Sequence, residues 1–160
     1  MSFLRFLMFL SLVVWVGGLI FFVVVAPTAF QLLPTRLLAG TLVGSLLTKL
    51  HWMAIGSGVV FLMSSLAYSR ISEGTAHPFA LRNVLICVML ALTLFSQFWI
   101  TPRMITLRAQ VYSFDTADTL TLPGRIQFDA LHVWSTRLEI GVLLLGLLTV
   151  YLLASAPLQR

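Results

Sequence analysis

Charged side chains are scarce in this sequence. Asp, Glu, Lys and Arg make up 9% of the 160 residues, whereas 59% are hydrophobic, and soluble domains carry about 25% charged residues. So little charge cannot cover the outside of a water-soluble globule, and the apolar excess must face lipid or a partner protein. The composition therefore excludes an ordinary soluble enzyme and a disordered chain.

Cysteine and the common catalytic motifs are also lacking. The one cysteine, Cys87, lies inside an apolar run, so it forms neither an internal disulfide nor a cysteine-based metal site by itself. The sequence holds no GxSxG, HExxH, P-loop or GxGxxG motif, and no CxxCH for covalent haem. These absences exclude a disulfide scaffold and favour a protein that is not an enzyme.

The net charge of +5 does not indicate a nucleic-acid partner. The basic residues are scattered singly between apolar runs, and they form no basic stripe with interleaved aromatic residues. At the edges of apolar runs, Lys and Arg anchor helices beside lipid headgroups. We therefore expect the lipid bilayer as the partner, and no nucleic acid.

Four apolar windows have the length of a membrane span, which is about 20 residues. They cover residues 6–30, 50–68, 84–100 and 133–153. The first is too long for a signal-peptide core and no small-x-small cleavage pattern follows it, so we expect it to be retained. With no internal repeat, residues 1–160 are predicted to form a single membrane domain.

The connections between these windows predict additional short helices. Residues 31–49 are Leu-rich, with Gly40 and Gly44 four positions apart, and we expect an interfacial helix there before the chain turns into the second span. After the third span, Pro102 is suited to open a new helical turn. The predicted fold is all-α, a four-transmembrane-helix bundle with short interfacial helices.

An even number of spans places both termini on one side of the membrane. The basic residues then divide between the two faces. Arg5, Arg70, Arg82 and Arg160 lie on the side of the termini, and Arg36, Lys49, Arg103, Arg108, Arg125 and Arg137 lie on the other. The count favours a cytoplasmic location for the second face, whereas Arg5 beside the first helix favours the reverse. Giving the first helix more weight, we predict cytoplasmic termini.

Small and polar residues inside the windows predict how the helices associate, because close backbone approach and polar contacts hold helices together in lipid. The candidate contact residues are Gly17, Gly18, Gly56, Gly58, Gly141 and Gly146. Pro27 removes a backbone hydrogen bond and is expected to kink the first helix. Gln97 should face another helix, since an unpaired amide in hydrocarbon costs several kcal/mol, roughly.

Ionisable residues at membrane depth are functional candidates. Five residues near the face opposite the termini form a predicted polar cluster: His51, Arg103, His132, Arg137 and Glu139. Glu139 lies roughly 9 Å inside the fourth span. It needs a proton or a cation, and Arg137, two positions away, points to another side of the helix. We therefore expect its partner to be Lys49, Arg103, Arg36 or His51.

Three interpretations of this cluster stay open. In the first, an ion-pair network holds the fourth helix in register and no cofactor is bound. In the second, His51, His132 and Glu139 form a metal site, or a proton or substrate gate; two histidines and a carboxylate suit zinc or another first-row metal, although no HxxxH or HxxE spacing occurs. In the third, His51 and His132 are axial ligands of a haem.

Several short motifs occur together in a recognisable order. They are Trp15-Val-Gly-Gly, Ala26-Pro27, Phe30-Gln-Leu-Leu-Pro34, Gly40, Trp99-Ile-Thr-Pro102-Arg103-Met and Phe128-Asp-Ala-Leu-His132-Val-Trp-Ser135. In this order the chain resembles, over nearly its whole length, the transmembrane protein 205-like family of small four-helix membrane proteins. The positions that carry over are Pro34, Gly40, Pro102, Arg103, His132 and Ser135, without assigned roles.

That resemblance implies little biochemistry, because the family is largely uncharacterised. Its animal members are linked to resistance to platinum drugs, which points to metal complexes or to membrane trafficking. The four-helix membrane protoporphyrinogen oxidases would have a histidine in the first span, and this sequence has none there.

The leading functional hypothesis is a small transporter-like protein or an accessory subunit that works at the polar cluster. We expect it to act as a homo-oligomer or within a larger membrane complex. The alternative is a redox membrane protein that binds haem or a transition metal through His51 and His132.

Overall fold

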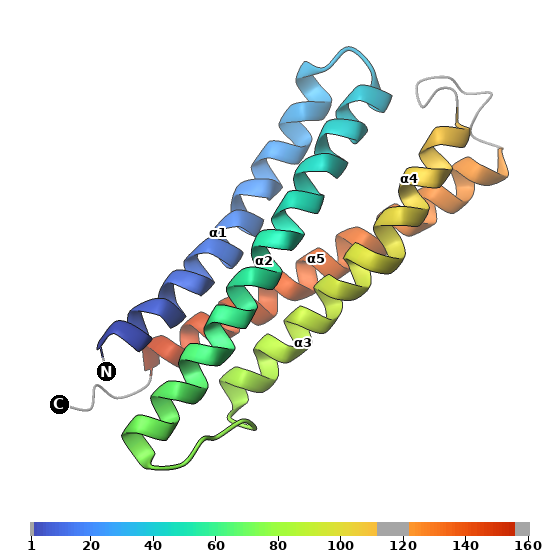
Figure 1. Ribbon diagram of the computed structural model, residues 1–160. Coiled ribbons are helices and arrows are strands. Elements are labelled where there is room, and N and C mark those ends of the chain that lie inside the picture. The colour runs from blue at the N-terminus through green and yellow to red at the C-terminus, as the bar shows by residue number, and fades with distance from the viewer. Residues whose placement is uncertain (1, 112–121, 156–160) are drawn as a thin grey trace.

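The computed structural model describes residues 2–111 and 122–155, so Arg160 lies outside the described residues. The helices are α1 (Ser2–Leu32), α2 (Arg36–Glu73), α3 (Leu81–Phe95), the π-helix η1 (Ser96–Ile100), α4 (Thr101–Gln110) and α5 (Pro123–Ser155). Within the described ranges there is no strand. Figure 1 shows the predicted all-α architecture, a bundle of four long helical rods in which α3, η1 and α4 make up one rod.

Local chemistry sets the two ends of α2. The Thr35 hydroxyl accepts a hydrogen bond from the backbone N–H of Leu38 (3.2 Å), which satisfies one of the N–H groups left over at a helix start. At the other end Gly74 has φ 73°, the left-handed conformation that glycine adopts without steric cost. The α1–α2 turn is therefore confined to the few residues around Pro34.

The predicted interfacial helices differ from what the structure contains. Residues 36–49 belong to α2, which continues without interruption for 38 residues, and α4 follows α3 through η1. Extending a helix adds one hydrogen bond per residue, whereas starting a new one requires a new nucleus and leaves four N–H groups unsatisfied. At about 57 Å, α2 exceeds the roughly 30 Å hydrocarbon core, so its excess length takes the place of a separate interfacial helix.

The chain runs up and down through the bundle. In Figure 1 the start of α1, the α2–α3 connection and the end of α5 lie at one end of the molecule, and the α1–α2 turn lies at the other. This arrangement follows from four successive antiparallel crossings. It agrees with the prediction that an even number of spans brings both ends of the chain to one side.

Three glycines allow the helices to approach closely near the middle of the bundle. A Cβ atom at Gly18 would lie 2.7 Å from Leu50, one at Gly58 would lie 2.6 Å from Leu90, and one at Gly146 would lie 2.6 Å from Val16. Around them the core is tightly closed, with Trp15, Phe61, Ile86, Met89 and Val142 all nearly inaccessible. Here α1, α2, α3 and α5 pack together.

Not every predicted small-residue contact is present. A Cβ at Gly17, Gly56 or Gly141 would meet nothing within 4 Å, so these glycines do not permit any close approach. Pro27, which was predicted to kink the first helix, lies inside α1, and the helix continues past it to Leu32. The kink itself stays a prediction. Hydropathy cannot separate Gly17 from Gly18, because adjacent positions differ by about 100° around the helix and only the packing decides which one faces a neighbour.

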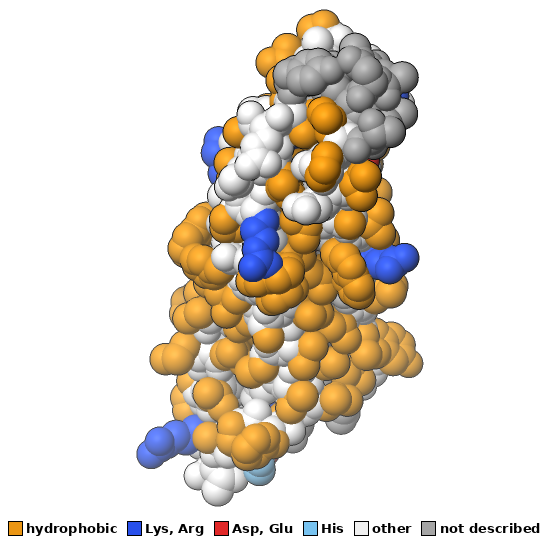
Figure 2. Space-filling model, turned by 90° about the vertical axis from the view of Figure 1, so that its right-hand side faces the viewer, with side chains coloured by type: hydrophobic (Ala, Val, Ile, Leu, Met, Phe, Trp, Pro, Cys, Tyr) orange, Lys and Arg blue, Asp and Glu red, His pale blue; other side chains and the backbone are white. Residues whose placement is uncertain are grey.

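The outside of the bundle is apolar. Figure 2 shows a nearly continuous hydrophobic surface over the lower half of one face, bordered above by Lys or Arg side chains at about mid-height and below by another near the lower end. Many large apolar residues are exposed, among them Phe21, Met63, Leu144 and Tyr151, and Cys87 is exposed as well. A surface of this kind is stable only in lipid, and all four rods are long and apolar enough to cross a membrane. The protein is a multi-pass integral membrane protein.

Candidate functional site

His51 connects three helices from a fully buried position in α2. Its Nε2 atom lies 2.7 Å from Oε1 of Glu139 in α5, and its Nδ1 atom lies 2.8 Å from Oε1 of Gln97 in η1. The His51 residue is 1% exposed. Of the four predicted partners of Glu139, His51 is the one that the fold brings to it, and Gln97 meets another helix as expected.

The protons of this network are constrained by the acceptors around His51. Both ring nitrogens face oxygen atoms, and a neutral imidazole has a single N–H. With the Gln97 amide oriented as in the structure, Nδ1–H donates to Gln97. The Nε2 atom then faces the Glu139 carboxyl group at 2.7 Å, where the donor and acceptor roles depend on the tautomer of His51.

The π-helix η1 supplies two members of the network. Gln97 lies within it, and the hydroxyl of the preceding residue, Ser96, donates to Oε1 of Glu139 at 3.5 Å. The wider turn is supported by the Thr101 hydroxyl, which donates to the Ser96 carbonyl at 3.0 Å. Single π turns inside helices occur often at functional sites. This turn was not predicted from the sequence. Pro102, which follows η1 directly, is a local signal for it, because proline has no N–H and cannot make the regular helix bond to residue 98.

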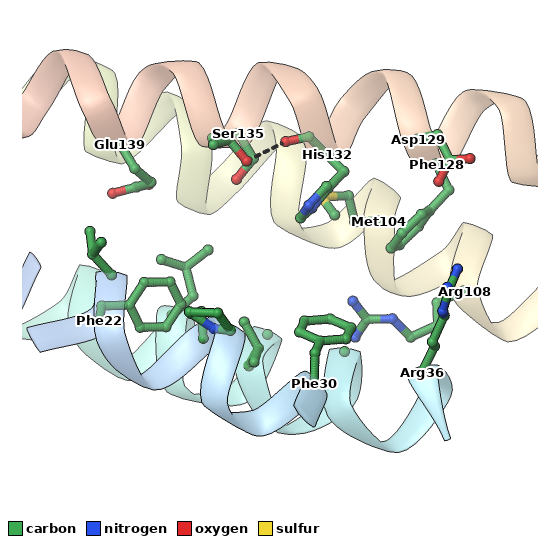
Figure 3. Close-up of a pocket in the computed structure, with 18 of the residues that line it drawn as sticks. Phe22, Phe30, Arg36, Met104, Arg108, Phe128, Asp129, His132, Ser135 and Glu139 are labelled. Carbon is green, nitrogen blue, oxygen red and sulfur yellow. Dashed lines mark hydrogen bonds between the residues drawn. The ribbon is translucent and has the colours of Figure 1, made fainter. Parts of the chain in front are cut away.

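A cavity of about 650 Å³ adjoins the network. Its walls come from α1, α2, α4 and α5, and Glu139 lies at its inner end. Figure 3 shows Glu139 and His132 of α5 pointing into it, across from Phe22 and Phe30 of α1. The lining of α5 extends from Arg125 to Leu143, about 27 Å along the helix. The cavity is therefore elongated along the helices and mostly apolar.

The outer end of this cavity is rich in arginine. Arg36, Arg108 and Arg125 line it together with Asp129, which accepts from Arg125 Nε at 2.9 Å. Counted over residues 2–111 and 122–155, the cavity lining at this end has three arginines and one aspartate. From the sequence these arginines were expected at a membrane face, and of the three only Arg36 was a candidate partner of Glu139.

Arg108 is held by packing. Its guanidinium carbon lies 5.3 Å from the centre of the Phe128 ring, and a Cβ on Gly40 or Gly44 would come within 3.6 Å of Nη2 or 3.1 Å of Nη1, respectively. Among residues 2–111 and 122–155, no carboxylate or hydrogen-bond acceptor is paired with Arg108. The Gly40-x-x-x-Gly44 spacing is a sequence signal that could have located this niche, but it was interpreted only as part of a predicted interfacial helix.

The predicted polar cluster divides in the structure. Arg103 is exposed, with its guanidinium 3.6 Å from the centre of the Trp99 ring, and Arg137 is exposed beside Trp134 at 5.6 Å. Neither lines the cavity. Long arginine side chains at a membrane edge reach outward and stack on interfacial aromatic rings, whereas the shorter Glu139 and His51 remain between the helices.

The other predicted positions have separate surroundings. His132 stacks on Phe128, with ring centres 6.3 Å apart, and it lines the cavity with Gly40 and Ser135. In the part of the chain that the structure describes, no three His, Cys, Asp or Glu side chains are grouped to hold a metal ion. The metal and haem hypotheses for His51 and His132 stay predictions.

Comparison with known families places the chain among uncharacterised proteins. The model of the family described as "Domain of unknown function (DUF4149)" matches residues 10–113, which extend from α1 past the end of α4. No curated protein and no solved structure matches the chain. Nothing in the match bears on the transmembrane protein 205-like resemblance, which stays a prediction. Since the match covers more than half of the sequence, the chain belongs to the DUF4149 family.

Proposed function

We propose that this protein is transporter-like and takes up an amphiphilic ligand in the cavity between the α1–α2 hairpin and the α4–α5 pair. The observation that carries the proposal is the cavity itself, about 650 Å³ in volume. Ligand pockets commonly enclose about 300–1,000 Å³, with apolar walls and a few polar groups. This one combines an arginine-rich outer end, aromatic walls and a carboxyl group at its inner end.

The space is a cleft that opens to the surface between the two helical pairs, so it is not an enclosed packing defect. Protein interiors are close-packed and contain few voids larger than a water molecule. The opposite half of the same bundle is packed so closely that Gly58 and Gly146 have no room for a Cβ atom. Two halves with such different packing are expected where one half holds the helices together and the other half opens to a ligand.

The location of Glu139 supports a transport role over a purely structural one. Ionisable groups inside a membrane often mark substrate or proton pathways. Glu139 lines the cavity and also contacts the buried His51, so a ligand that enters the cavity lies against the group that is paired with His51. An accessory subunit that only docks on a larger protein would not need the cavity.

Photo-crosslinking in cells tests whether the cavity takes up an amphiphile. Cells are given a diazirine-bearing fatty acid that they build into their membrane lipids, and crosslinked residues are mapped by mass spectrometry after irradiation. We expect crosslinks at cavity residues such as Phe22, Phe30 and Leu143, besides those at lipid-facing residues.

A matched pair of variants makes that test specific. Val43 lines the cavity, whereas its neighbour Leu42 does not and is exposed. Val43→Trp should remove the cavity crosslinks and keep the others, and Leu42→Trp should keep both. Crosslinks confined to lipid-facing residues in the unmodified protein would contradict uptake into the cavity and favour the accessory-subunit hypothesis.

A further inference from the structure

Arg108 occupies a setting that calls for an anion. It lies half-buried in the cavity, and among the described residues it has no ion pair. A charge removed from water and left without a counter-charge is costly near lipid. Its contact with the Phe128 ring compensates only part of that cost. An anionic group that enters the cavity would compensate the rest of that cost.

The shape of the niche suits an anion with several oxygen atoms. Gly40 and Gly44 let the guanidinium lie directly against α2, because a Cβ atom on either glycine would meet Nη2 or Nη1. This contact holds the guanidinium at the wall of the cavity that it lines. A guanidinium donates two parallel hydrogen bonds to phosphate or carboxylate. Among the described residues, the charged side chains that line this end of the cavity are three arginines and Asp129, a set that favours an anionic head over a cationic one.

The rest of the cavity suits an acyl chain. The α1 wall extends from Leu19 to Phe30, about 16 Å, and Ile140 and Leu143 face it from α5. A free inorganic anion would bind at Arg108 and leave this apolar length unoccupied. Basic pockets between membrane helices typically bind the phosphate groups of lipids.

We propose that the cavity binds a lipid phosphate, with the phosphate on Arg108 and the acyl chain along α1. This inference rests on the proposed uptake of an amphiphile and adds the chemistry of its head. It also gives a specific role to Gly40, a motif position to which the sequence assigned none, because a glycine there lets the Arg108 guanidinium pack against α2.

A binding titration on the full-length protein in dodecyl maltoside tests the inference, with native mass spectrometry as the readout. Three probes are compared: 1-oleoyl lysophosphatidate, monooleoylglycerol with the same chain but no phosphate, and inorganic phosphate. We expect lysophosphatidate to bind at one saturable site, about tenfold or more tighter than monooleoylglycerol, because charge-assisted hydrogen bonds contribute most of the difference. Inorganic phosphate should not bind.

Variants of Arg103 and Arg108, both on α4, test where the phosphate binds. Arg108→Gln should weaken lysophosphatidate binding about tenfold or more, and Arg108→Lys should weaken it less, because the charge remains while the paired donors are lost. Arg103→Gln, on the same helix but stacked on Trp99 outside the cavity, should leave binding unchanged. Equal losses in Arg103→Gln and Arg108→Gln, or no loss in Arg108→Gln, would overturn the assignment.

A second pair of variants keeps Arg108 and changes only how its guanidinium packs against α2. Gly44→Val places side-chain atoms against Nη1 and should weaken lysophosphatidate binding, whereas Gly56→Val, on the same helix in open space, should not. Equal binding of the two lipids would refute the phosphate head and leave the uptake of amphiphiles standing. Binding of neither lipid would refute both proposals, and tight binding of inorganic phosphate alone would show a free-anion site.

Discussion

His51 lies fully buried between α2, η1 and α5, and it has a polar partner on each of the other two. The sequence identified Glu139 as a group that needs a partner and named four candidates. It could not choose among them, because the choice depends on the rotation of α2 about its axis. Arg103 and Lys49 have the right charge, but their side chains are exposed.

Removing one member of this pair should destabilise the protein strongly. His51→Leu leaves the Glu139 carboxyl group without its partner, and breaking a buried pair in this way costs about 3–5 kcal/mol. Glu139→Leu should also destabilise, and the double variant should lose clearly less than the sum of the two, because no buried carboxyl group remains. The free energy of unfolding in mixed detergent and dodecyl sulfate micelles measures all three.

A second His–Glu pair in the chain serves as a control for these three variants. His77 and Glu73 are 2.8 Å apart, but their side chains are 50% and 44% exposed, and exposed pairs contribute about 0–1 kcal/mol. The corresponding His77→Leu and Glu73→Leu variants should therefore change the unfolding free energy little. If the double variant loses as much unfolding free energy as the sum of His51→Leu and Glu139→Leu, the two side chains do not stabilise the protein through their contact with each other.

At the scale of helices, the sequence predicted the helical rods but not their faces. The four apolar windows correspond to the rods that are long enough to span a membrane, and their glycines indicated close packing. Which glycine lies at a contact follows from the tertiary structure. Gly146 of α5 faces Val16 of α1, whereas Gly141, five positions earlier, faces open space.

A pair of alanine substitutions on α5 should separate the two glycines. Gly146→Ala forces a methyl group to within 2.6 Å of Val16 and should lower the unfolding free energy by about 1–3 kcal/mol, since overpacking shifts side chains and backbone. Gly141→Ala should be neutral or stabilising by up to about 1 kcal/mol, because alanine is the better helix former. Thermal unfolding in detergent measures both, and equal effects would show that α1 and α5 do not pack at Gly146.

For the whole molecule, the up-and-down path places the α1–α2 turn and the α2–α3 connection on opposite sides of the membrane (Figure 1). The orientation itself stays a prediction, with cytoplasmic termini. The balance of basic residues does not depend on the packing, so the fold adds nothing to that choice.

Cysteine labelling in intact cells reports the crossing pattern and the orientation together. In a Cys87→Ser background, Pro34→Cys marks the α1–α2 turn and Thr75→Cys marks the α2–α3 connection. A membrane-impermeant maleimide should label one of the two and not the other, because α2 lies between them across the membrane. Labelling of Pro34→Cys alone would confirm cytoplasmic termini, and labelling of both sites would contradict the crossing of α2.

Composition and hydropathy alone determined that this is a membrane protein, that it is all-α and that four rods cross the bilayer. These properties depend on how many apolar residues follow one another along the chain, which is a local quantity. Periodicity also indicated that residues after the first and third spans are helical, although it placed helix breaks where continuation adds a hydrogen bond at every residue.

The tertiary structure decided which side chains meet. The pairing of His51 with Glu139, the placement of Arg108 against Gly40 and Gly44, and the cavity between two helical pairs each depend on helix rotations and crossing points. Those rotations are set by the summed packing of many residues from different helices. No single stretch of the sequence contains that sum, so the cavity and the position of Arg108 within it become visible only in the assembled bundle.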